Sequence, residues 1–489
     1  MTAPVRRRAP TALGAISAAV YAFLYAPLLV LVVFSFNRGR LTAAWQGFTL
    51  AWYGRALGSA QVLDSLRNSL VVAFTTTAAC AVIATAAALV LARRHFRGAG
   101  AFGALLTLPM VVPEVVLASS LLLLFAGAGM RLGLLTVVLA HVSFSLSYAV
   151  IVVRARLAGL DRSLEEAAAD LGAGPWRAFW HVTLPLIAPG VLAAALLVFA
   201  LSLDDYVVTS FVAGVGATTL PVHVYSMVKS GVSPEINAVS TLLLVATSLL
   251  LYAAYRLEQG KTRGAALPAL LGLGLLLAPF APRRAAPGQD RVLNVYIWSG
   301  YIAPETLRRF EARHGARVNI DLYDSLEALL AKVQAGNTDY DVICPSNYAV
   351  QALVHQDLLR PLDHGALPHR VNLDPRFVDR HFDPGNRYSM PYLWGTAGIG
   401  YNRARAGTVD SWDALWDPRF RGRILMLDDA RESLGAALKR LGLSFNATDP
   451  ESLRRAQRLL LLQKPLVRTY NSASFDDALV SGDVWLAHG

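Results

Sequence analysis

Carboxylates stand inside long apolar runs at two places in this sequence. Glu114 follows Pro113 within one run, and Asp204 and Asp205 lie together within another. Because a charged side chain is costly in hydrocarbon, such acids usually face a bundle interior or an aqueous path, where they can act as counter-charges for a passing cation. Alternatively, they satisfy freed backbone groups or bind neighbouring helices. The sequence favours neither reading.

Residue patterns for covalent chemistry are absent from the sequence. It has no Gly-x-x-x-x-Gly-Lys-Ser/Thr phosphate loop, no nucleophile elbow and no His/Glu zinc spacing. Its two cysteines, Cys80 and Cys344, offer neither a metal-site spacing nor a disulfide framework. We therefore expect a chain that is not an enzyme, binds no metal and carries no cofactor of its own.

Composition places the chain among membrane proteins. Hydrophobic residues make up 54% of the 489 positions and charged residues 16%, which is too apolar for a soluble protein of this size. The long apolar runs lie in 1–281, whereas 290–489 has the composition of a soluble α/β protein. The net charge of +11 could indicate nucleic acid, but the basic residues cluster beside apolar runs, as at Arg6–Arg8 and Arg93–Arg94, as the positive-inside rule describes. We expect contact with lipid and no nucleic-acid partner.

Six apolar runs are long enough to cross a hydrocarbon core of about 30 Å. They are 12–36, 68–92, 101–127, 134–153, 190–212 and 236–256. With the N-terminus inside, the basic flanks fall on the cytoplasmic side. A shorter run at 265–281 is either a seventh span or an internal signal sequence, and in both cases the segment after it lies outside the cytoplasm. Residues 282–290 read as a linker.

The polar stretch between the fourth and fifth runs carries a spaced pattern. Its fixed positions are Glu166, Ala167, Ala168, Gly172, Val182, Leu184 and Pro185. This pattern resembles the EAA coupling loop of ABC-importer permease subunits, with Val182 in place of an isoleucine. The resemblance implies that a separate ATPase dimer binds ATP and docks on this loop. Gly172 permits a sharp turn between two short helices, and Pro185 and Pro189 are expected to interrupt the chain as it re-enters the membrane.

From Arg291 onward the pattern changes to alternating strands and helices. Strands are predicted at 292–298, 317–323 and 341–345, and helices at 304–313, 326–334 and from 349. This alternation predicts a parallel sheet whose ligand groups lie at the carboxyl ends of the strands.

Two further resemblances narrow the substrate. The segment 202–234 resembles the polyamine permease subunit of the PotC type, and the segments 295–301, 341–348, 388–402 and 427–432 resemble the spermidine/putrescine-binding protein family. The second resemblance implies a substrate-binding set of Trp298, Ser299, Tyr301, Ser346, Tyr348, Asp429 and Glu432.

Side-chain chemistry agrees with that role. An aromatic face attracts an alkylammonium group by about 0.5–2 kcal/mol, and carboxylates add charge-assisted hydrogen bonds. Asp429 and Glu432 are three residues apart and share one face if both are helical. Alternatively, Trp298 is ordinary core packing and Asp429 only caps a helix. Asp428 is the better candidate for a purely structural role.

Together these resemblances imply an all-α polytopic membrane domain followed by an α/β, two-lobed periplasmic-binding-protein-like domain. Residues 1–260 are expected to form the permease, 261–290 an extra span or uncleaved signal with its linker, and 291–489 an extracytoplasmic polyamine receptor. The receptor family continues beyond the match to Gly489, so we expect either that the sequence is a fragment or that its second lobe is incomplete.

The implied function is the permease and substrate-binding component of an ATP-driven polyamine importer in the bacterial inner membrane. Its partners would be an ATPase dimer, a second permease subunit and the polyamine. The alternatives are ABC import of another small cation or organic solute, and a membrane-tethered polyamine sensor without transport.

Overall fold

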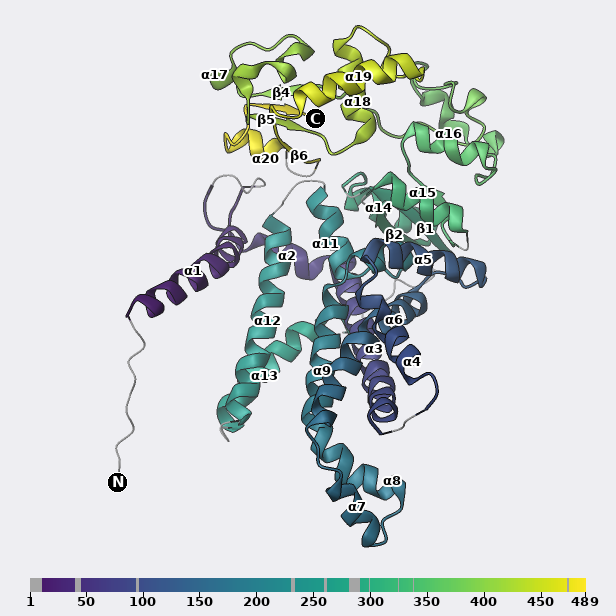
Figure 1. Ribbon diagram of the computed structural model, residues 1–489. Coiled ribbons are helices and arrows are strands. Elements are labelled where there is room, and N and C mark those ends of the chain that lie inside the picture. Colours follow the sequence, from purple (N-terminus) through teal and green to yellow (C-terminus); the bar gives the residue numbers. More distant parts are fainter. Residues whose placement is uncertain are drawn as a thin grey trace. The chain divides into compact units, whose positions relative to one another are not determined.

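The computed structural model describes most of the chain (Figure 1). The described residues are 11–39, 45–93, 96–229, 234–258, 262–280, 291–298, 300–323, 325–336, 338–472 and 475–489. The expected linker at 282–290 and the basic cluster Arg6–Arg8 lie outside them. The chain divides into two compact units, one comprising Met1–Ser59, Met227–Ala281 and Gly395–Gly489, the other Ala60–Ser226 and Pro282–Trp394. Each unit combines apolar helices with a β-sheet.

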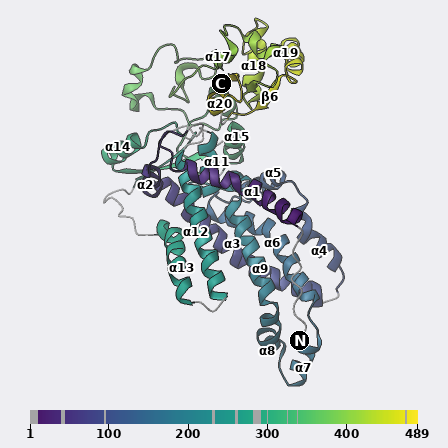
Figure 2. The ribbon, with the colours of Figure 1, turned by 90° about the vertical axis from the view of Figure 1, so that its left-hand side faces the viewer.

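Three long helices form the core of the membrane part of the second unit. They are α3 (Ala60–Arg93), α6 (Leu134–Ala158) and α9 (Leu184–Asp204), and they pack against one another in pairs. Figure 2 shows them side by side. Their shared core is rich in small residues, including Ala84, Ala88, Ala149 and Ala194. Small side chains let apolar helices approach closely.

Two of the predicted apolar runs are broken. The run 101–127 forms α4 (Ala99–Thr107), a short 3₁₀ turn and α5 (Glu114–Gly127), with a bend of 107° where Pro109 and Pro113 interrupt the helix. The run 190–212 is divided between α9 and α10 (Val207–Val212), because Asp205 adopts an extended conformation between them. Neither run therefore forms one straight helix, although the sequence marks each of them as long enough to span a membrane.

Four uninterrupted helical segments of the described chain are long and apolar enough to cross a membrane, or five if the bent pair counts as one span. They lie in α1 (Thr11–Phe34), in α3, in α6 and over Pro175–Asp204. The helices α12 (Pro234–Glu258) and α13 (Thr262–Leu277) contain shorter apolar segments. The six spans expected from the sequence, with 265–281 as a seventh, therefore stay a prediction.

The sheet of the second unit is parallel, as predicted. Strand β1 (Arg291–Trp298) lies between β2 (Ala316–Tyr323) and β3 (Val342–Ile343). The helices that connect or follow these strands are α14 (Pro304–His314), α15 (Leu326–Ala335) and α16 (Asn347–His355). Strand β3 is shorter than the predicted 341–345.

The first unit contains its own membrane-type helices and a mixed sheet. Helix α12 packs against α1, α13 and the short α2 (Ala51–Gly58). The sheet has the order β4-β7-β5-β6, and β4 runs antiparallel to β7 while the other pairs are parallel. Its strands are β4 (Ile399–Tyr401), β5 (Ile424–Met426), β6 (Val467–Tyr470) and β7 (Leu486–His488), and its larger helices are α18 (Ala430–Arg440) and α19 (Pro450–Gln463).

Candidate functional site

An aromatic pair stands at the carboxyl end of the parallel sheet in the second unit. Trp298 ends β1 opposite Tyr323, which ends β2, and their ring centroids are 4.6 Å apart. Trp298 is half-buried and packs on the core beneath α15 and α16. It therefore has the packing role that the sequence left open, and part of its surface remains accessible. Tyr323 was not predicted as a site residue, although its position at a strand end could have indicated it.

Hydrogen bonds hold the loops around this pair. The Tyr323 hydroxyl donates to the carbonyl oxygen of Cys344 at 2.5 Å, which ties the end of β2 to the segment after β3. Tyr301 is 44% exposed, and the hydroxyl of Tyr392 donates to its carbonyl oxygen at 2.6 Å. Burial raises the pKa of Tyr323, so its hydroxyl remains a donor at neutral pH. Tyr392 fixes the backbone of the predicted ligand residue Tyr301.

The remaining predicted residues of this unit follow β3. Ser346 precedes α16 as its N-cap, but its side chain makes no capping hydrogen bond. Tyr348 is half-buried and packs against the same core as Trp298. Since β3 lies beside β1 in the sheet, Ser346 and Trp298 are placed at the same sheet edge. Ser299 lies outside the described residues.

The two acids of the first unit form a helix cap. Asp429 has an extended backbone and is the N-cap of α18, where its carboxylate accepts a hydrogen bond from the Glu432 backbone N–H at 2.9 Å. The two acids do not share one helical face, because Asp429 precedes the helix and caps it, as the alternative reading of the sequence allowed. They remain neighbours as the first and fourth positions of a capping motif.

The side chain of Glu432 is suited to bind a cationic group. It is half-buried, and its Oε2 atom makes no hydrogen bond within the part of the chain that the structure describes. Burial, and then the charge of Asp429, raise the pKa of this carboxyl. A buried acceptor without a donor is unfavourable, and an ammonium group would supply both a donor and a compensating charge.

The EAA stretch folds as two short helices. Helix α7 (Ser163–Asp170) and α8 (Pro175–Ala178) are joined at Gly172, whose φ of +81° requires a left-handed conformation. The predicted turn is confirmed. Ala168 is half-buried, whereas Glu166 and Ala167 are exposed on α7. Figure 1 shows α7 and α8 beyond the end of α9.

Glu165, which lies just before the fixed positions of the EAA pattern, anchors this loop. Its Oε1 atom accepts hydrogen bonds from Arg93 at 2.8 Å and from the Thr183 hydroxyl at 2.7 Å. The inward-facing acid of α7 is thus Glu165, which binds the last residue of α3, whereas the neighbouring Glu166 is exposed. Leu171 and Trp176 are 90% and 71% exposed beside it, so the loop presents an apolar surface together with an acid.

The prolines after this loop do not interrupt the chain. The helical segment runs without a break from Pro175 to Asp204. A π-helical turn (Phe179–Thr183) precedes Leu184, and Pro185 occupies the first turn of α9, where a missing N–H is tolerated. Pro189 lies inside the helix, so the predicted interruption at Pro185 and Pro189 is wrong.

The acids of the apolar runs differ in their surroundings. Glu114 and Asp204 are exposed on this chain. Asp205 accepts hydrogen bonds from the backbone N–H and the hydroxyl of Thr209 at 2.8 and 2.7 Å, and it lies 3.2 Å from Nε2 of buried His141. Asp205 therefore caps α10 and joins it to α6, which is the structural alternative considered for it.

Comparisons with known proteins decide the family. Residues 80–263 match the model of the binding-protein-dependent transport system inner membrane component. The putrescine transport system permease protein PotI of Escherichia coli is 45% identical over 244 residues, which cover 48% of this chain and 87% of PotI. The chain belongs to this family of transport-system membrane components. The spermidine/putrescine permease protein PotC of E. coli is 40% identical over 51% of this chain and 95% of PotC.

The C-terminal region has different relatives. Residues 305–489 match the model of the bacterial extracellular solute-binding protein. The putrescine/cadaverine-binding protein of Pseudomonas aeruginosa is 38% identical over 223 residues, which cover 44% of this chain and 63% of that protein. This family member is thus a multi-pass membrane protein of a transport system that continues into a solute-binding region of the periplasmic-binding-protein type.

Proposed function

We propose that the chain is the permease and substrate-binding component of an ATP-driven importer of polyamines such as putrescine and spermidine. One observation carries the proposal: a permease region related to PotI and PotC continues into a receptor region in which a buried carboxylate oxygen of Glu432, beside Asp429, has no hydrogen-bond donor among the described residues. A diammonium or triammonium chain supplies such donors, and its methylene groups suit aromatic walls.

In the proposed receptor, residues 291–489 lie outside the cytoplasm and bind the polyamine. Trp298 and Tyr301 would contact the alkyl chain and one ammonium group, with Ser299, Ser346 and Tyr348 beside them. Asp429 and Glu432 would bind an ammonium end. Because the receptor is tethered, its effective concentration at its own permease exceeds that of a free binding protein.

In the proposed membrane domain, residues 1–260 form the permease beside a second permease subunit, and 261–290 form an extra span or uncleaved signal with its linker. A separate ATPase dimer binds ATP and contacts Glu166, Ala167, Ala168 and Gly172, while Leu184 and Pro185 join this contact to α9. The chain itself would bind no metal or cofactor. Glu114 and Asp204 are the acids that we assign to the cation path.

The test is uptake of labelled putrescine and spermidine by cells that carry this chain with its transporter subunits. We expect ATP-dependent uptake that Glu166→Lys abolishes without changing binding of the polyamine to the receptor. Asp170→Lys makes the same charge change on α7 outside the fixed pattern and serves as the matched control. Uptake unaffected by Glu166→Lys would refute the coupling role of this loop. Binding without any uptake would instead indicate a sensor, and neither binding nor uptake would indicate a different solute.

A further inference from the structure

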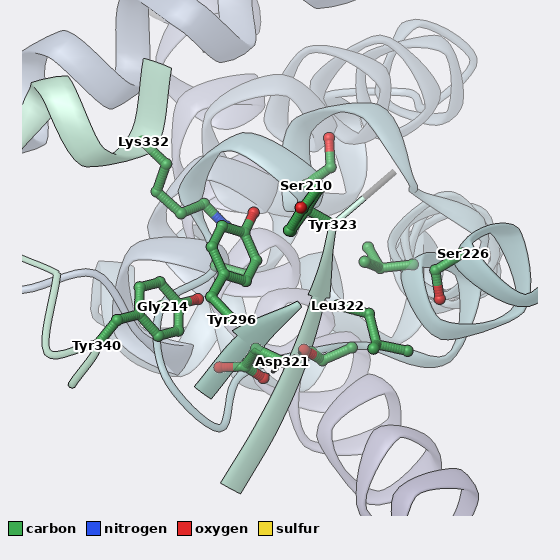
Figure 3. Close-up of a pocket in the computed structure, with 12 residues that line it drawn as sticks. Ser210, Gly214, Ser226, Tyr296, Asp321, Leu322, Tyr323, Lys332 and Tyr340 are labelled. Carbon is green, nitrogen blue, oxygen red and sulfur yellow. Dashed lines mark hydrogen bonds between the residues drawn. The ribbon is translucent and has the colours of Figure 1, made fainter. Parts of the chain in front are cut away.

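The loop between α10 and α11 (Leu220–Lys229) contacts the receptor sheet of the same compact unit. Asp321, near the carboxyl end of the second receptor strand β2, directs its carboxylate into this loop (Figure 3). Its Oδ2 atom accepts from the Gly216 backbone N–H at 2.9 Å, and its Oδ1 atom accepts from the Thr218 hydroxyl at 2.7 Å. Asp321 is only 4% exposed. A charge buried to this extent requires good partners, and two of them come from the membrane region.

Hydrogen bonds to helix α3 hold this loop on the side of the membrane region. The Asn68 side-chain amide of α3 donates to the carbonyl oxygens of Gly216 and Thr218 at 2.8 and 3.0 Å. The Leu220 backbone N–H donates to the Ser69 hydroxyl at 2.8 Å. The loop therefore has partners of its own on the membrane side, and its two donors to Asp321 are held in place. Such preorganisation lowers the cost of binding a carboxylate.

Glycine is needed at the base of this loop. A Cβ atom at Gly214 would lie 1.9 Å from the carbonyl oxygen of Leu132. The loop backbone is thus in direct contact with the segment before α6, and any larger residue would displace it.

The receptor side contributes further charge around Asp321. Lys332 of α15 is also 4% exposed, and its Nζ atom lies 5.1 Å from the centre of the Tyr296 ring. Tyr296 stacks on Tyr340 with ring centres 4.5 Å apart. Burial raises the pKa of Asp321, while the Thr218 and Gly216 hydrogen bonds and the Lys332 charge oppose that effect. The carboxylate is therefore balanced by donors from both regions.

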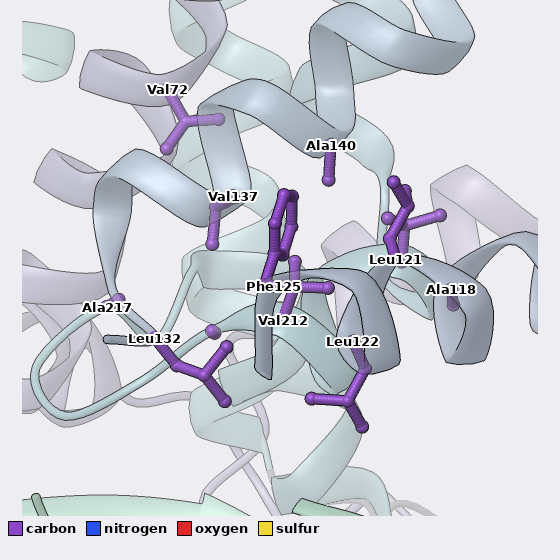
Figure 4. Close-up of a cluster of buried hydrophobic side chains, with 12 residues drawn as sticks. Val72, Ala118, Leu121, Leu122, Phe125, Leu132, Val137, Ala140, Val212 and Ala217 are labelled. Atoms are coloured by element: carbon purple, nitrogen blue, oxygen red, sulfur yellow. The ribbon is translucent and has the colours of Figure 1, made fainter. Parts of the chain in front are cut away.

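Apolar packing surrounds this polar contact. Helix α15 packs against α5 and α10, and its Ala331 and Ala335 lie on the buried cluster that contains Leu122, Phe125 and Val212. Figure 4 shows the membrane part of this cluster. Arg131 and Asp339 form an ion pair at 3.8 Å between the membrane region and the receptor lobe. Both side chains are exposed, so the pair contributes little to the stability of this contact, because water screens such pairs.

We propose that residues 214–218 are a docking site for the first receptor lobe, with Asp321 as its anchor. This lobe remains seated on its own membrane region, whereas the second lobe belongs to the other compact unit. The inference concerns contacts within the chain and does not depend on which solute is transported.

Hydrogen–deuterium exchange of the full chain in lipid nanodiscs, without ligand, tests this docking. The Gly216 amide reports on the contact, since its acceptor is Asp321. We expect Asp321→Ala to accelerate exchange of the 214–219 peptide at least tenfold while the β1 peptide 291–298 stays protected. Asp339→Asn is the matched control and should leave 214–219 unchanged.

Two outcomes overturn the proposal. One is unchanged exchange at 214–219 in Asp321→Ala with β1 still protected. If β1 loses protection, the lobe itself has been disrupted and Thr218→Val decides, because that variant leaves every receptor residue intact. Tenfold faster exchange at Gly216 in Thr218→Val then supports the docking site, and unchanged exchange overturns it. Failure here would leave the uptake result unaffected, so the two proposals fail separately.

Discussion

Replacing Asp429 by asparagine separates its two roles. In the structure Asp429 caps α18 through a 2.9 Å hydrogen bond from the Glu432 N–H, and in the proposed function it also attracts an ammonium group. Asparagine caps helices about as well as aspartate, so Asp429→Asn removes the charge and keeps the cap. Asp429→Ala removes both.

The expected magnitudes follow from these contacts. A hydrogen bond to a charged partner contributes about 1.5–3 kcal/mol, so Asp429→Asn should weaken putrescine binding by about 10- to 100-fold. Loss of the cap in Asp429→Ala should destabilise α18 by about 1 kcal/mol in addition. Calorimetric titration of the full chain in nanodiscs measures the first effect, and hydrogen exchange over α18 measures the second.

Asp428 provides the matched control for this prediction. It is exposed one position before Asp429, and its backbone N–H donates to Ser472. Asp428→Asn makes the same change of charge and should leave the affinity within about twofold, since a surface charge contributes little. Equal losses in Asp428→Asn and Asp429→Asn would show a general electrostatic effect. Unchanged affinity in Asp429→Asn would remove this residue from the site.

Two further predictions concern the receptor. Burial lowers the pKa of His488 to about 4 in the folded protein, whereas an unfolded histidine has a pKa of about 6.5. The unfolded state therefore binds the proton first as the pH falls, and the free energy of unfolding should be about 2 kcal/mol lower at pH 5 than at neutral pH. Exchange of β7 at pH 5 should therefore slow in His488→Gln relative to the wild type, while exposed His355→Gln has no effect; equal exchange would contradict this. Tyr392→Phe removes the bond to the Tyr301 carbonyl and should weaken putrescine binding about fivefold, with faster exchange at 300–303. Tyr388→Phe is its control, and a loss of affinity without faster exchange would exclude the positioning role.

The receptor elements could be predicted because their patterns are local. The strands at 292–298 and 317–323 and the helices at 304–313 and 326–334 each agree with the structure within one residue at either end. Alternation of strand and helix also predicted the parallel pairing of β1 with both neighbours. The antiparallel β4 could not be predicted in this way, since its pairing with β7 joins residues far apart in the sequence.

The breaks in the apolar helices were less predictable. Hydropathy measures the length of a run, and the runs 101–127 and 190–212 are long enough for one helix each. Pro109 and Pro113 mark the first break, whereas the second depends on Asp205 capping α10. Pro185 and Pro189 are also a pair of prolines in an apolar segment, but the helix that contains them is unbroken. The effect of a proline depends on its position within a helical turn and on the residues packed around it. The sequence alone does not show that packing.

A short motif can indicate candidate site residues, whereas a contact between residues far apart in the sequence leaves no local pattern. Asp429 and Glu432 lie close enough in the sequence to be proposed as a pair, but the burial of the Glu432 Oε2 atom, which has no donor among the described residues, depends on packing that the sequence does not show. Asp321 is a single acid within a predicted strand. Its donors Gly216 and Thr218 lie about a hundred residues earlier in the chain, so no local pattern indicates the contact.

The acids of the membrane region show how the structure narrows an open question. A counter-charge for a moving cation must be free to release its partner, because a site that binds too firmly does not conduct. The carboxylate of Asp205 already accepts two hydrogen bonds from Thr209 and lies beside buried His141. Taking those bonds away would uncap α10, which leads directly into the loop that binds Asp321. Asp205 is thus better suited to keeping the loop of residues 214–218 in place than to passing a cation, and Glu114 and Asp204 are the candidates for the proposed cation path.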